Sequence, residues 1–242
     1  MAVNRGVQPP VTVVVPTLNE EATLDGVLAD VAAYADEVIV IDGHSTDRTP
    51  EIARRHNVRF LLDEGRGKGC AVRLGMTLAS HPIVVFFDAD GSHDPRDIPR
   101  LVQPIRDGEA DLVIASRMTG GSDELSSDLS ELVRLTGSMV INLCINYRWN
   151  VRLSDTQNGF RALRREVGND LGLRADSTTV EQEMAMKALS RGYRVINVPS
   201  HEFRRKGGHS KVDVKRVWPA YLWNIFVNVL RRSKARRGGA DR

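Results

Sequence analysis

Two aspartates, Asp88 and Asp90, stand one residue apart directly after the apolar run Val84–Phe87. In an open α/β sheet, ligands bind at the carboxyl ends of the parallel strands. Two carboxylates at such an end offer hard oxygen ligands, which suit Mg²⁺ or Mn²⁺ when substrate phosphates complete the coordination. The alternative is structural, because Asp-x-Asp is a common pattern and both residues could begin a loop and cap the next helix.

Two earlier apolar runs also end in polar residues. Val11–Val15 is followed by the segment Pro16-Thr17-Leu18-Asn19-Glu20, and Val38–Ile41 ends in Asp42. If these runs are parallel strands, all three ends lie along one edge of the sheet. A carboxylate at one end can bind a ribose hydroxyl, while a metal-bound carboxylate at another holds a diphosphate. The pattern predicts a nucleotide cleft without a glycine-rich phosphate loop.

Strand-like apolar runs alternate with helical segments, which is typical of βαβ units and a mostly parallel sheet. Strands buried on both faces read as continuous apolar runs, and these do. The sequence therefore predicts an α/β fold with a single Rossmann-like sheet flanked by helices. Expected strands cover residues 11–15, 38–41, 58–62, 83–87, 112–115, 159–163 and 193–198, and expected helices cover 20–34, 45–56, 69–79, 95–105, 129–147 and 179–190.

Composition excludes several classes of protein. The 242 residues carry a net charge of only +3, which gives no reason to expect a nucleic-acid partner. Two cysteines make neither a disulfide framework nor a zinc site, and residues 1–10 lack a signal-peptide core. The most apolar stretch, residues 217–230, is shorter than the roughly 20 residues that a spanning helix needs. We therefore expect a cytoplasmic protein.

The glycine-rich segment Gly65-Arg66-Gly67-Lys68-Gly69 fits no standard phosphate loop. Gly69 stands where a P-loop has Ser or Thr, and the segment follows the third expected strand rather than the first. It is either a flexible loop or a basic loop that closes on a nucleotide.

Four segments, in this order, resemble the nucleotide-sugar half of a family 2 glycosyltransferase with the GT-A fold. They are residues 16–20, residues 41–47 (Ile-Asp-Gly-His-Ser-Thr-Asp), residues 67–69 and Asp88-Ala89-Asp90. The resemblance covers about the first 120 residues and implies a divalent cofactor, Mg²⁺ or Mn²⁺. It assigns the donor, a GDP- or UDP-hexose, to Pro16, Thr17, Glu20, Asp42, Lys68, Asp88 and Ala89.

The sequence departs from this family pattern at several positions. Leu18 replaces an aromatic residue of many relatives, and Gly43-His44 replaces an Asp-Gly pair, so the identity of the base stays open. Ser92 stands where relatives have a Gln, so it is expected to assist Asp88 and Asp90 as a weaker metal ligand. His93 is either a third ligand or a turn residue.

Later segments are most similar to the polyprenyl-phosphate sugar synthases of that family, the dolichyl-phosphate mannose synthase group. The segments are Ser116-Arg117, Arg134 with Ser138, the motif from Asp155 to Arg161, Glu181-Gln182-Glu183, and Arg205 with Lys211. The resemblance implies that Arg117, Arg134, Ser138 and Asp155 receive an acceptor phosphate, and that Arg205 and Lys211 clamp the donor diphosphate. The expected catalytic residues are Asp88, Asp90, Arg117, Arg134 and Glu183.

The chemistry of the acceptor decides what the site must provide. A phosphomonoester, with a second pKa of about 6, is already nucleophilic at neutral pH and needs cations rather than a base. Arg117 and Arg134 would supply them. An alcohol would need a general base, either Asp155 or Glu183, although both acids could instead pair with arginines such as Arg161. The expected mechanism is a single in-line displacement that inverts the anomeric centre.

The C-terminal segment differs from the rest. Residues 1–212 are expected to form the GT-A domain, divided into a nucleotide-sugar half (1–120) and an acceptor half (121–212). Residues 213–242 predict an amphipathic helix and a basic tail, with Trp218, Tyr221 and Trp223 of the kind found at membrane interfaces. This helix either lies on a membrane, making the protein peripheral, or packs on the domain or in a homodimer.

The sequence thus predicts a metal-dependent inverting glycosyltransferase that moves a hexose, mannose or glucose, from a nucleotide sugar to polyprenyl or dolichyl phosphate. Three alternatives remain. One is a glycosyltransferase of the same family with a soluble acceptor, such as a secondary metabolite or a sugar phosphate. The others are a nucleotidyltransferase and a non-catalytic nucleotide-sugar binder.

Overall fold

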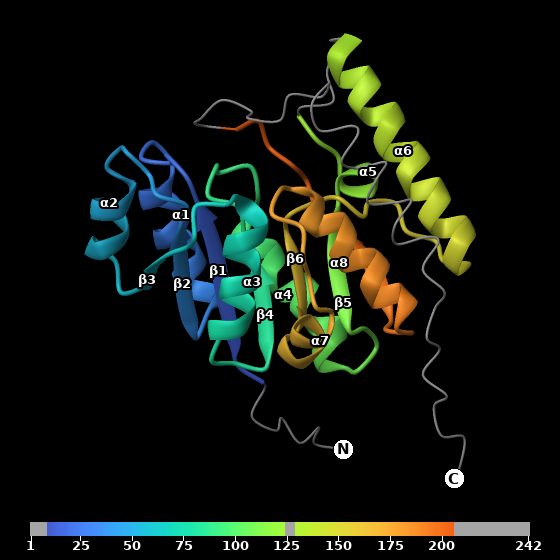
Figure 1. The fold of residues 1–242 in the computed structure, drawn as a ribbon, viewed down its shortest axis with the longest axis horizontal. Helices are drawn as coiled ribbons and strands as arrows, with labels where there is room; N and C mark the ends of the chain where they lie inside the picture. The colour runs from blue at the N-terminus through green and yellow to red at the C-terminus, as the bar shows by residue number, and fades with distance from the viewer. Residues whose placement is uncertain (1–8, 124–128, 206–242) are drawn as a thin grey trace.

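A twisted seven-stranded sheet forms the centre of the protein (Figure 1). The structure is a computed structural model that describes residues 9–123 and 129–205, without the side chains of residues 129–135. The strand order is β3-β2-β1-β4-β6-β5-β7. The strands are β1 (Val11–Thr17), β2 (Glu37–Asp42), β3 (Arg59–Leu62), β4 (Ile83–Phe86), β5 (Leu112–Ser116), β6 (Arg161–Arg164) and β7 (Val195–Pro199).

The sheet is mostly parallel, as predicted. β1 pairs in parallel with β2 and β4, β2 with β3, and β5 with β7. Only β6 runs in the opposite direction, between β4 and β5. Each of the seven predicted strand regions overlaps one of these strands, with ends that differ by up to two residues. The parallel pairing places the carboxyl ends of β1, β2 and β4 side by side.

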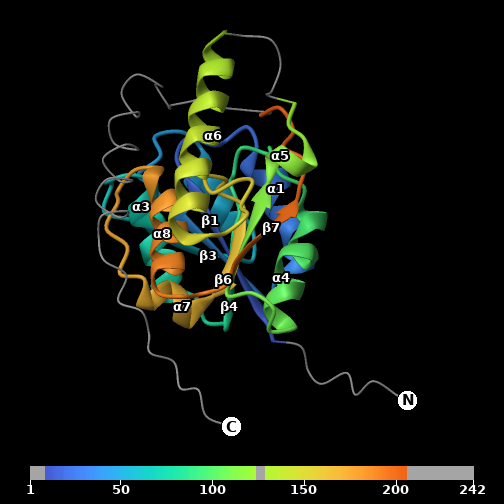
Figure 2. The same cartoon turned by 90° about the vertical axis from the view of Figure 1, so that its right-hand side faces the viewer.

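Helices cover both faces of the sheet (Figure 2). α1, α2 and α4 pack against one face, while α3, α6, α7 and α8 contribute to the core on the other. The helices are α1 (Leu24–Val31), α2 (Thr49–Arg55), α3 (Lys68–Leu78), α4 (Ile98–Arg106), α5 (Arg117–Gly120), α6 (Leu129–Trp149), α7 (Arg165–Asp170) and α8 (Thr179–Ser190), with short 3₁₀ turns η1 (Ala32–Tyr34) and η2 (Pro95–Asp97).

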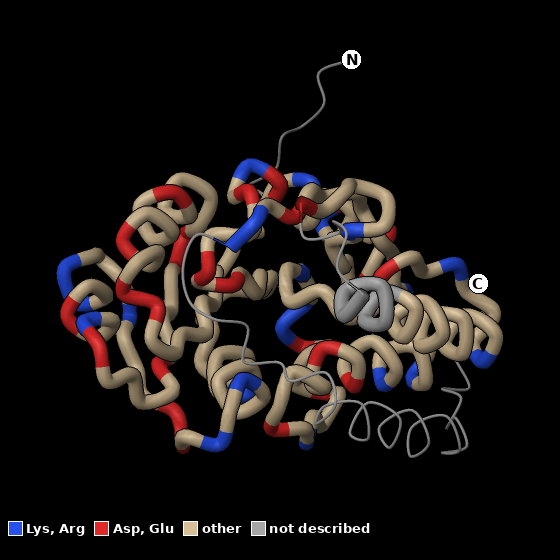
Figure 3. The backbone as a smooth tube through the Cα atoms, turned by 90° about the horizontal axis from the view of Figure 1, so that it is seen from above, with Lys and Arg blue, Asp and Glu red and all other residues tan. Residues whose placement is uncertain are grey.

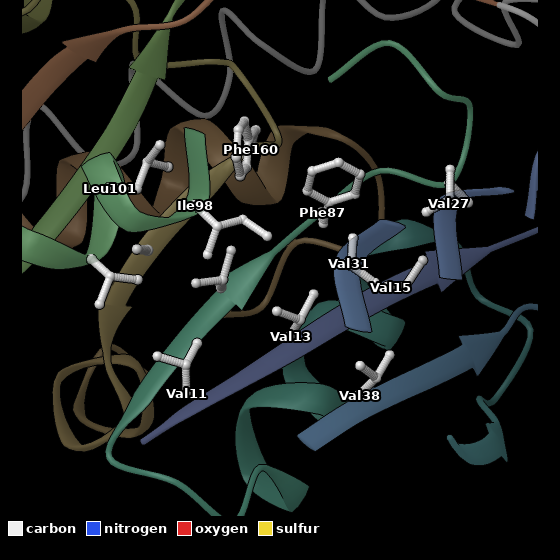
Figure 4. Packing of buried hydrophobic residues seen from close by; sticks show 14 of the residues in the cluster. Val11, Val13, Val15, Val27, Val31, Val38, Phe87, Ile98, Leu101 and Phe160 are labelled. Carbon is white, nitrogen blue, oxygen red and sulfur yellow. The ribbon is translucent and has the colours of Figure 1, made fainter. Parts of the chain in front are cut away.

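β1 shows why the strands are mostly apolar. Val11, Val13 and Val15 point into the core beneath α1 and α4, whereas Val14 packs on the opposite face (Figure 4). Successive side chains of a strand alternate between faces, so a strand with a helical layer on each side is apolar at most positions. Thr12, the buried polar residue of β1, donates a hydrogen bond to Glu37.

Two predicted helices begin later than expected. The helix expected from residue 20 begins at Leu24, and the one expected from residue 45 begins at Thr49. Residues 21–23 form a turn and residues 46–48 form a bend before these helices begin. Asn19 and His44, which precede these segments, adopt positive φ angles of 57° and 66°, outside the helical region. Both residues therefore lie in loops at the sheet edge. The short helices α5 and α7 were not predicted.

No helix among the described residues is both long and apolar enough to cross a bilayer. The predicted C-terminal helix, residues 213–242, lies outside the described residues, as does Lys211.

Candidate active site

The predicted polar residues meet at one edge of the sheet. Thr17 and Asp42, the last residues of β1 and β2, are direct partners in the strand register. Asp88 and Asp90 follow the end of β4, the other neighbour of β1. Figure 3, which looks down from above on the view of Figure 1, shows both acidic and basic positions near the middle of the molecule. The prediction that three strand ends share an edge is therefore confirmed.

Asp42 is buried and binds groups of its own chain. Its carboxylate accepts hydrogen bonds from Thr17 Oγ1 at 3.2 Å and from the Ser45 backbone amide at 2.9 Å, and it also contacts the Ser45 hydroxyl. Ser45 Oγ in turn accepts from the Asn19 amide at 2.8 Å. Asp42 thus ties the loop after β1 to the loop after β2. Pro16, near the end of β1, and Glu20, on the loop after β1, are half-buried.

Asp88 belongs to a cluster of charges below the sheet edge. Lys68, the first residue of α3, lies 2.5 Å from Asp88 Oδ1 and 2.8 Å from Glu181 Oε1. His93 Nε2 lies 3.6 Å from the other Asp88 oxygen, with its ring packed beside Phe160. Burial opposes charge here, but the two carboxylates raise the pKa of Lys68, and Lys68 and His93 lower the pKa of Asp88. Lys68 and Asp88 are therefore charged at neutral pH.

Asp90 is held by a different set of donors. Ser92 donates to Asp90 Oδ1 through its amide at 3.0 Å and its hydroxyl at 2.6 Å. The Arg205 guanidinium lies 3.2 Å from Asp90 Oδ2, and the amide of Phe203 donates to the Ser92 carbonyl at 2.8 Å. Ser92 therefore orients Asp90, and the segment that carries Arg205 is attached directly to the Asp-x-Asp loop. Ala89 between the two aspartates is buried in the core.

The carboxylates of Asp88 and Asp90 suit a divalent cation, if oxygens of the substrate supply its remaining ligands. No group of three or more His, Cys, Asp or Glu residues with metal-ligand geometry exists in the described part of the chain. Mg²⁺ commonly needs only one or two protein carboxylates when phosphates supply the other ligands. Asp90 Oδ2 already faces a positive group, Arg205, so its position suits a cation.

Arg117 and Asp155 form the centre of the predicted acceptor side. Arg117 Nε donates to Asp155 Oδ2 at 2.7 Å and Nη2 to Oδ1 at 3.2 Å, in a two-pronged ion pair, while Glu202 lies 3.6 Å from Nη1. Burial acts to raise the pKa of Asp155, but Arg117 and backbone amides together lower it. Asp155 is almost fully buried, so it positions Arg117 rather than facing a substrate. This geometry does not support Asp155 as a general base.

The other two predicted acceptor residues lie on α6. Ser138 is half-buried, and Arg134 lies one turn before it, with a side chain outside the described part of the structure. Asn142, one further turn along, donates to the carbonyl of Ser154 at 2.8 Å. α6 is thereby attached to the loop that carries Asp155.

Glu183 does not join the site, which corrects the sequence-based expectation. Its carboxylate accepts hydrogen bonds from the amides of Arg174 and Ala175 at 2.8–3.1 Å and pairs with Lys187 at 2.6 Å. Residues two apart on an α-helix point to nearly opposite sides, because each residue advances about 100°. Glu181 therefore reaches Lys68, while Glu183 faces the loop before α8.

Replacing Glu183 with Gln is expected to lower the free energy of unfolding by about 2 kcal/mol, because a buried charge-assisted network loses its anion. Affinity for a nucleotide ligand should be unchanged. Urea denaturation and calorimetric titration measure the two effects. A variant as stable as the wild type, with a lost affinity, would contradict this assignment.

Arg161 links two segments next to the site. It is buried, and its guanidinium donates to the carbonyls of Asn158 and Glu181, at 3.0 and 2.7 Å. It thus joins the loop before β6 to the first turn of α8.

The strand order, with one reversed strand beside the acid-bearing strand β4, and the charged edge define a GT-A fold of the nucleotide-sugar transferase class. The chain belongs to glycosyl transferase family 2, whose sequence profile matches residues 12–172.

Known relatives agree with this membership. The chain is 32% identical over 204 residues to a dolichyl-phosphate hexose transferase of Haloferax volcanii, covering 83% of this chain and 86% of that protein. It is 36% identical over 203 residues to an uncharacterized glycosyltransferase of Mycobacterium tuberculosis, covering 84% and 89%. A dolichol-phosphate mannosyltransferase of Pyrococcus furiosus is 29% identical, with 89% of this chain and 62% of that protein covered.

Solved structures share the fold. Glucosyl-3-phosphoglycerate synthase of Mycobacterium tuberculosis, in complex with Mn²⁺, UDP and phosphoglyceric acid, superposes with a TM-score of 0.70 at 24% identity. The match covers 96% of this chain and 81% of that one.

Proposed function

We propose that this protein transfers a hexose, with inversion, from a nucleoside diphosphate sugar to polyprenyl phosphate, in a reaction that depends on Mg²⁺ or Mn²⁺. The observation that carries the proposal is the charged cluster beyond β4, in which Asp88 and Asp90 stand beside Lys68 and Arg205. Neutral apolar ligands would not need such a cluster, whereas a diphosphate and its counter-ion would.

The donor assignment rests on two supports. First, two carboxylates at a sheet edge, with Asp42 at the end of β2, suit a sugar, a ribose and a metal–diphosphate. Second, fold neighbours have been solved with UDP and Mn²⁺, and with UDP and Mg²⁺. Asp90, oriented by Ser92, would hold the cation, which neutralises charge that develops on the departing diphosphate. Arg205 would then contact the phosphate oxygens, and Lys211 is proposed to join it.

The acceptor assignment rests on Arg117. The Asp155 carboxylate fixes the orientation of the Arg117 guanidinium, and arginine grips phosphate oxygens in a bidentate way. The side chain of Arg117 is 20% exposed, so it can meet a ligand at the surface. Arg134 and Ser138 on α6 are proposed to complete the phosphate site. The names of the Haloferax and Pyrococcus relatives favour a lipid phosphate.

The proposed reaction needs no general base. The acceptor phosphate is mainly dianionic at neutral pH, and its oxygen attacks the anomeric carbon as the bond to the diphosphate breaks. Arg117 positions the attacking phosphate, and Arg205 stabilises the leaving diphosphate on the opposite face. Positioning and electrostatic stabilisation thus account for the rate.

A soluble phosphorylated acceptor is the second candidate. The fold neighbour solved with phosphoglyceric acid favours it, because a carboxylate-and-phosphate acid would also bind fixed arginines. Both candidates share the donor chemistry and differ only in what Arg117 receives.

A binding screen followed by product analysis tests the proposal. UDP, GDP, UDP-glucose and GDP-mannose should raise the melting temperature only when Mg²⁺ or Mn²⁺ is present, since ligands that bind the folded state stabilise it. Radiolabelled hexose should pass to polyprenyl phosphate with release of nucleoside diphosphate. Release of pyrophosphate would indicate nucleotidyl transfer, and transfer to phosphoglyceric acid alone would favour the soluble acceptor.

A further inference from the structure

Glu181 has one carboxylate oxygen that the cluster does not use. Its Oε1 pairs with Lys68 at 2.8 Å, but its Oε2 has no hydrogen-bond partner within the described chain. Glu181 is buried, with only 5% of its surface exposed. Leaving a buried carboxylate oxygen unsatisfied costs about 1–3 kcal/mol, so proteins rarely do so without a use.

Asn158 presents the complementary group. Its Oδ1 accepts from the Phe160 amide at 3.0 Å, which fixes the orientation of the side-chain amide. The Nδ2 group that remains is buried and lacks an acceptor among the residues described. Glu181 thus offers an unused acceptor and Asn158 an unused donor.

Two contacts hold these residues near each other and near Asp88. Arg161 binds the backbone carbonyls of both Asn158 and Glu181, so one guanidinium holds the two positions. Gly159, the neighbour of Asn158, lies so close to the cluster that an added Cβ would be 2.4 Å from Asp88 Oδ2 and 2.7 Å from Lys68 Nζ.

We propose that Glu181 and Asn158 form a subsite that recognises a hydroxyl group of the donor hexose. A sugar hydroxyl donates one hydrogen bond and accepts others, so it satisfies the free carboxylate oxygen and the free amide together. Lys68 positions both acids, Asp88 on the metal side and Glu181 on the sugar side. The inference rests on the proposed function, because it assigns the hexose of that donor.

The subsite determines which hexose is accepted. A site built to bond a particular hydroxyl rejects an analogue that lacks it, because the buried polar groups are then left unpaired. A charge-assisted hydrogen bond contributes about 1.5–3 kcal/mol, which corresponds to roughly 10- to 100-fold in affinity.

The test compares Glu181→Gln with the wild type by calorimetric titration in Mn²⁺. The probes are UDP, GDP, UDP-glucose, GDP-mannose and monodeoxy analogues of the sugar nucleotide that binds. Glu181→Gln should weaken the sugar nucleotide about 10-fold or more and leave the nucleoside diphosphate within twofold. Glu166→Gln, the same change at a side chain that is 79% exposed, is the matched control and should alter neither.

The deoxy analogues identify the hydroxyl. In the wild type, one deoxy position should weaken binding about 10-fold or more, and in Glu181→Gln that penalty should disappear. Asn158→Asp, which keeps the acceptor for Phe160 but removes the free donor, should give the same loss at the same position. The melting temperature of each variant shows that titrations are made on folded protein.

Two results would overturn the inference while leaving the proposed function intact. Equal weakening of nucleoside diphosphate and sugar nucleotide would mean that Glu181 acts only through Lys68 and Asp88. If each deoxy analogue loses the same affinity in the wild type and in the variants, other residues recognise the sugar hydroxyl groups. A wild type that binds no sugar nucleotide with either metal would overturn the proposed function, and this subsite with it.

Discussion

Gly159→Ala is expected to lower the rate of hexose transfer at least 100-fold. The added methyl group would lie 2.4 Å from Asp88 Oδ2 and 2.7 Å from Lys68 Nζ, closer than non-bonded atoms allow. Either the Asp88–Lys68 pair opens or the loop before β6 moves away. Both outcomes displace groups by about an ångström at a site where catalysis depends on positioning, and such displacement costs on the order of 100-fold.

The matched control is Gly26→Ala. Gly26 lies in α1, where an added Cβ meets nothing within 4 Å, so the same change should leave transfer and stability nearly unchanged. Steady-state kinetics with saturating metal measure the effect, and the loss should appear in kcat/KM for the donor. Full activity in Gly159→Ala would show that the Asp88 carboxylate does not have to keep its present position.

The strands of the sheet could be predicted from the sequence because the apolar pattern that marks a buried strand is local. Each strand of a two-sided sheet is mostly apolar, so β1, β2 and β4 stand out as apolar runs, and the polar residues at their ends can be assigned to one edge. The reversal of β6 was not predicted. Its direction follows from long-range pairing between β4 and β5, which no local pattern records.

Site residues were predictable where a strand end fixes them, and less so on helices. Asp42, Asp88 and Asp90 follow strands, whereas Glu181 and Glu183 occur together in one short motif. Which of the two reaches the site depends on their positions in α8. Glu181 lies on the side of the helix that faces Lys68, and Glu183, two residues later, points to the opposite side. Asn158 and Gly159 carry no charge, so only their contacts with Phe160 and Asp88 reveal their importance.

Asp155→Asn is expected to lower the free energy of unfolding by about 3–5 kcal/mol at neutral pH, the usual cost of breaking a buried ion pair. Asp155 is 1% exposed and holds Arg117 through two hydrogen bonds, besides accepting from the amides of Gln157 and Asn158. An amide cannot accept all of these bonds. Without its partner, Arg117 loses its fixed orientation, so the KM for the phosphate acceptor should rise at least 10-fold while donor affinity changes little.

The pH dependence has a definite sign. The pKa of Asp155 is lowered in the folded protein, so its contribution is present above the ordinary value of about 4 and is lost as the pH falls through the folded-state pKa. The stability difference between wild type and Asp155→Asn should therefore be constant from about pH 5 to 8 and shrink in stronger acid. Urea denaturation at a series of pH values measures it.

Arg117→Met supplies the complementary case. It leaves the Asp155 carboxylate buried without its cation, so this variant should be least stable at neutral pH and should recover relative to the wild type as Asp155 becomes protonated. The double variant should lose less stability than the sum of the single changes, by about 1–3 kcal/mol, because the pair is removed together. Strict additivity, or a difference that does not depend on pH, would mean that Arg117 and Asp155 are not coupled and that another group positions the arginine.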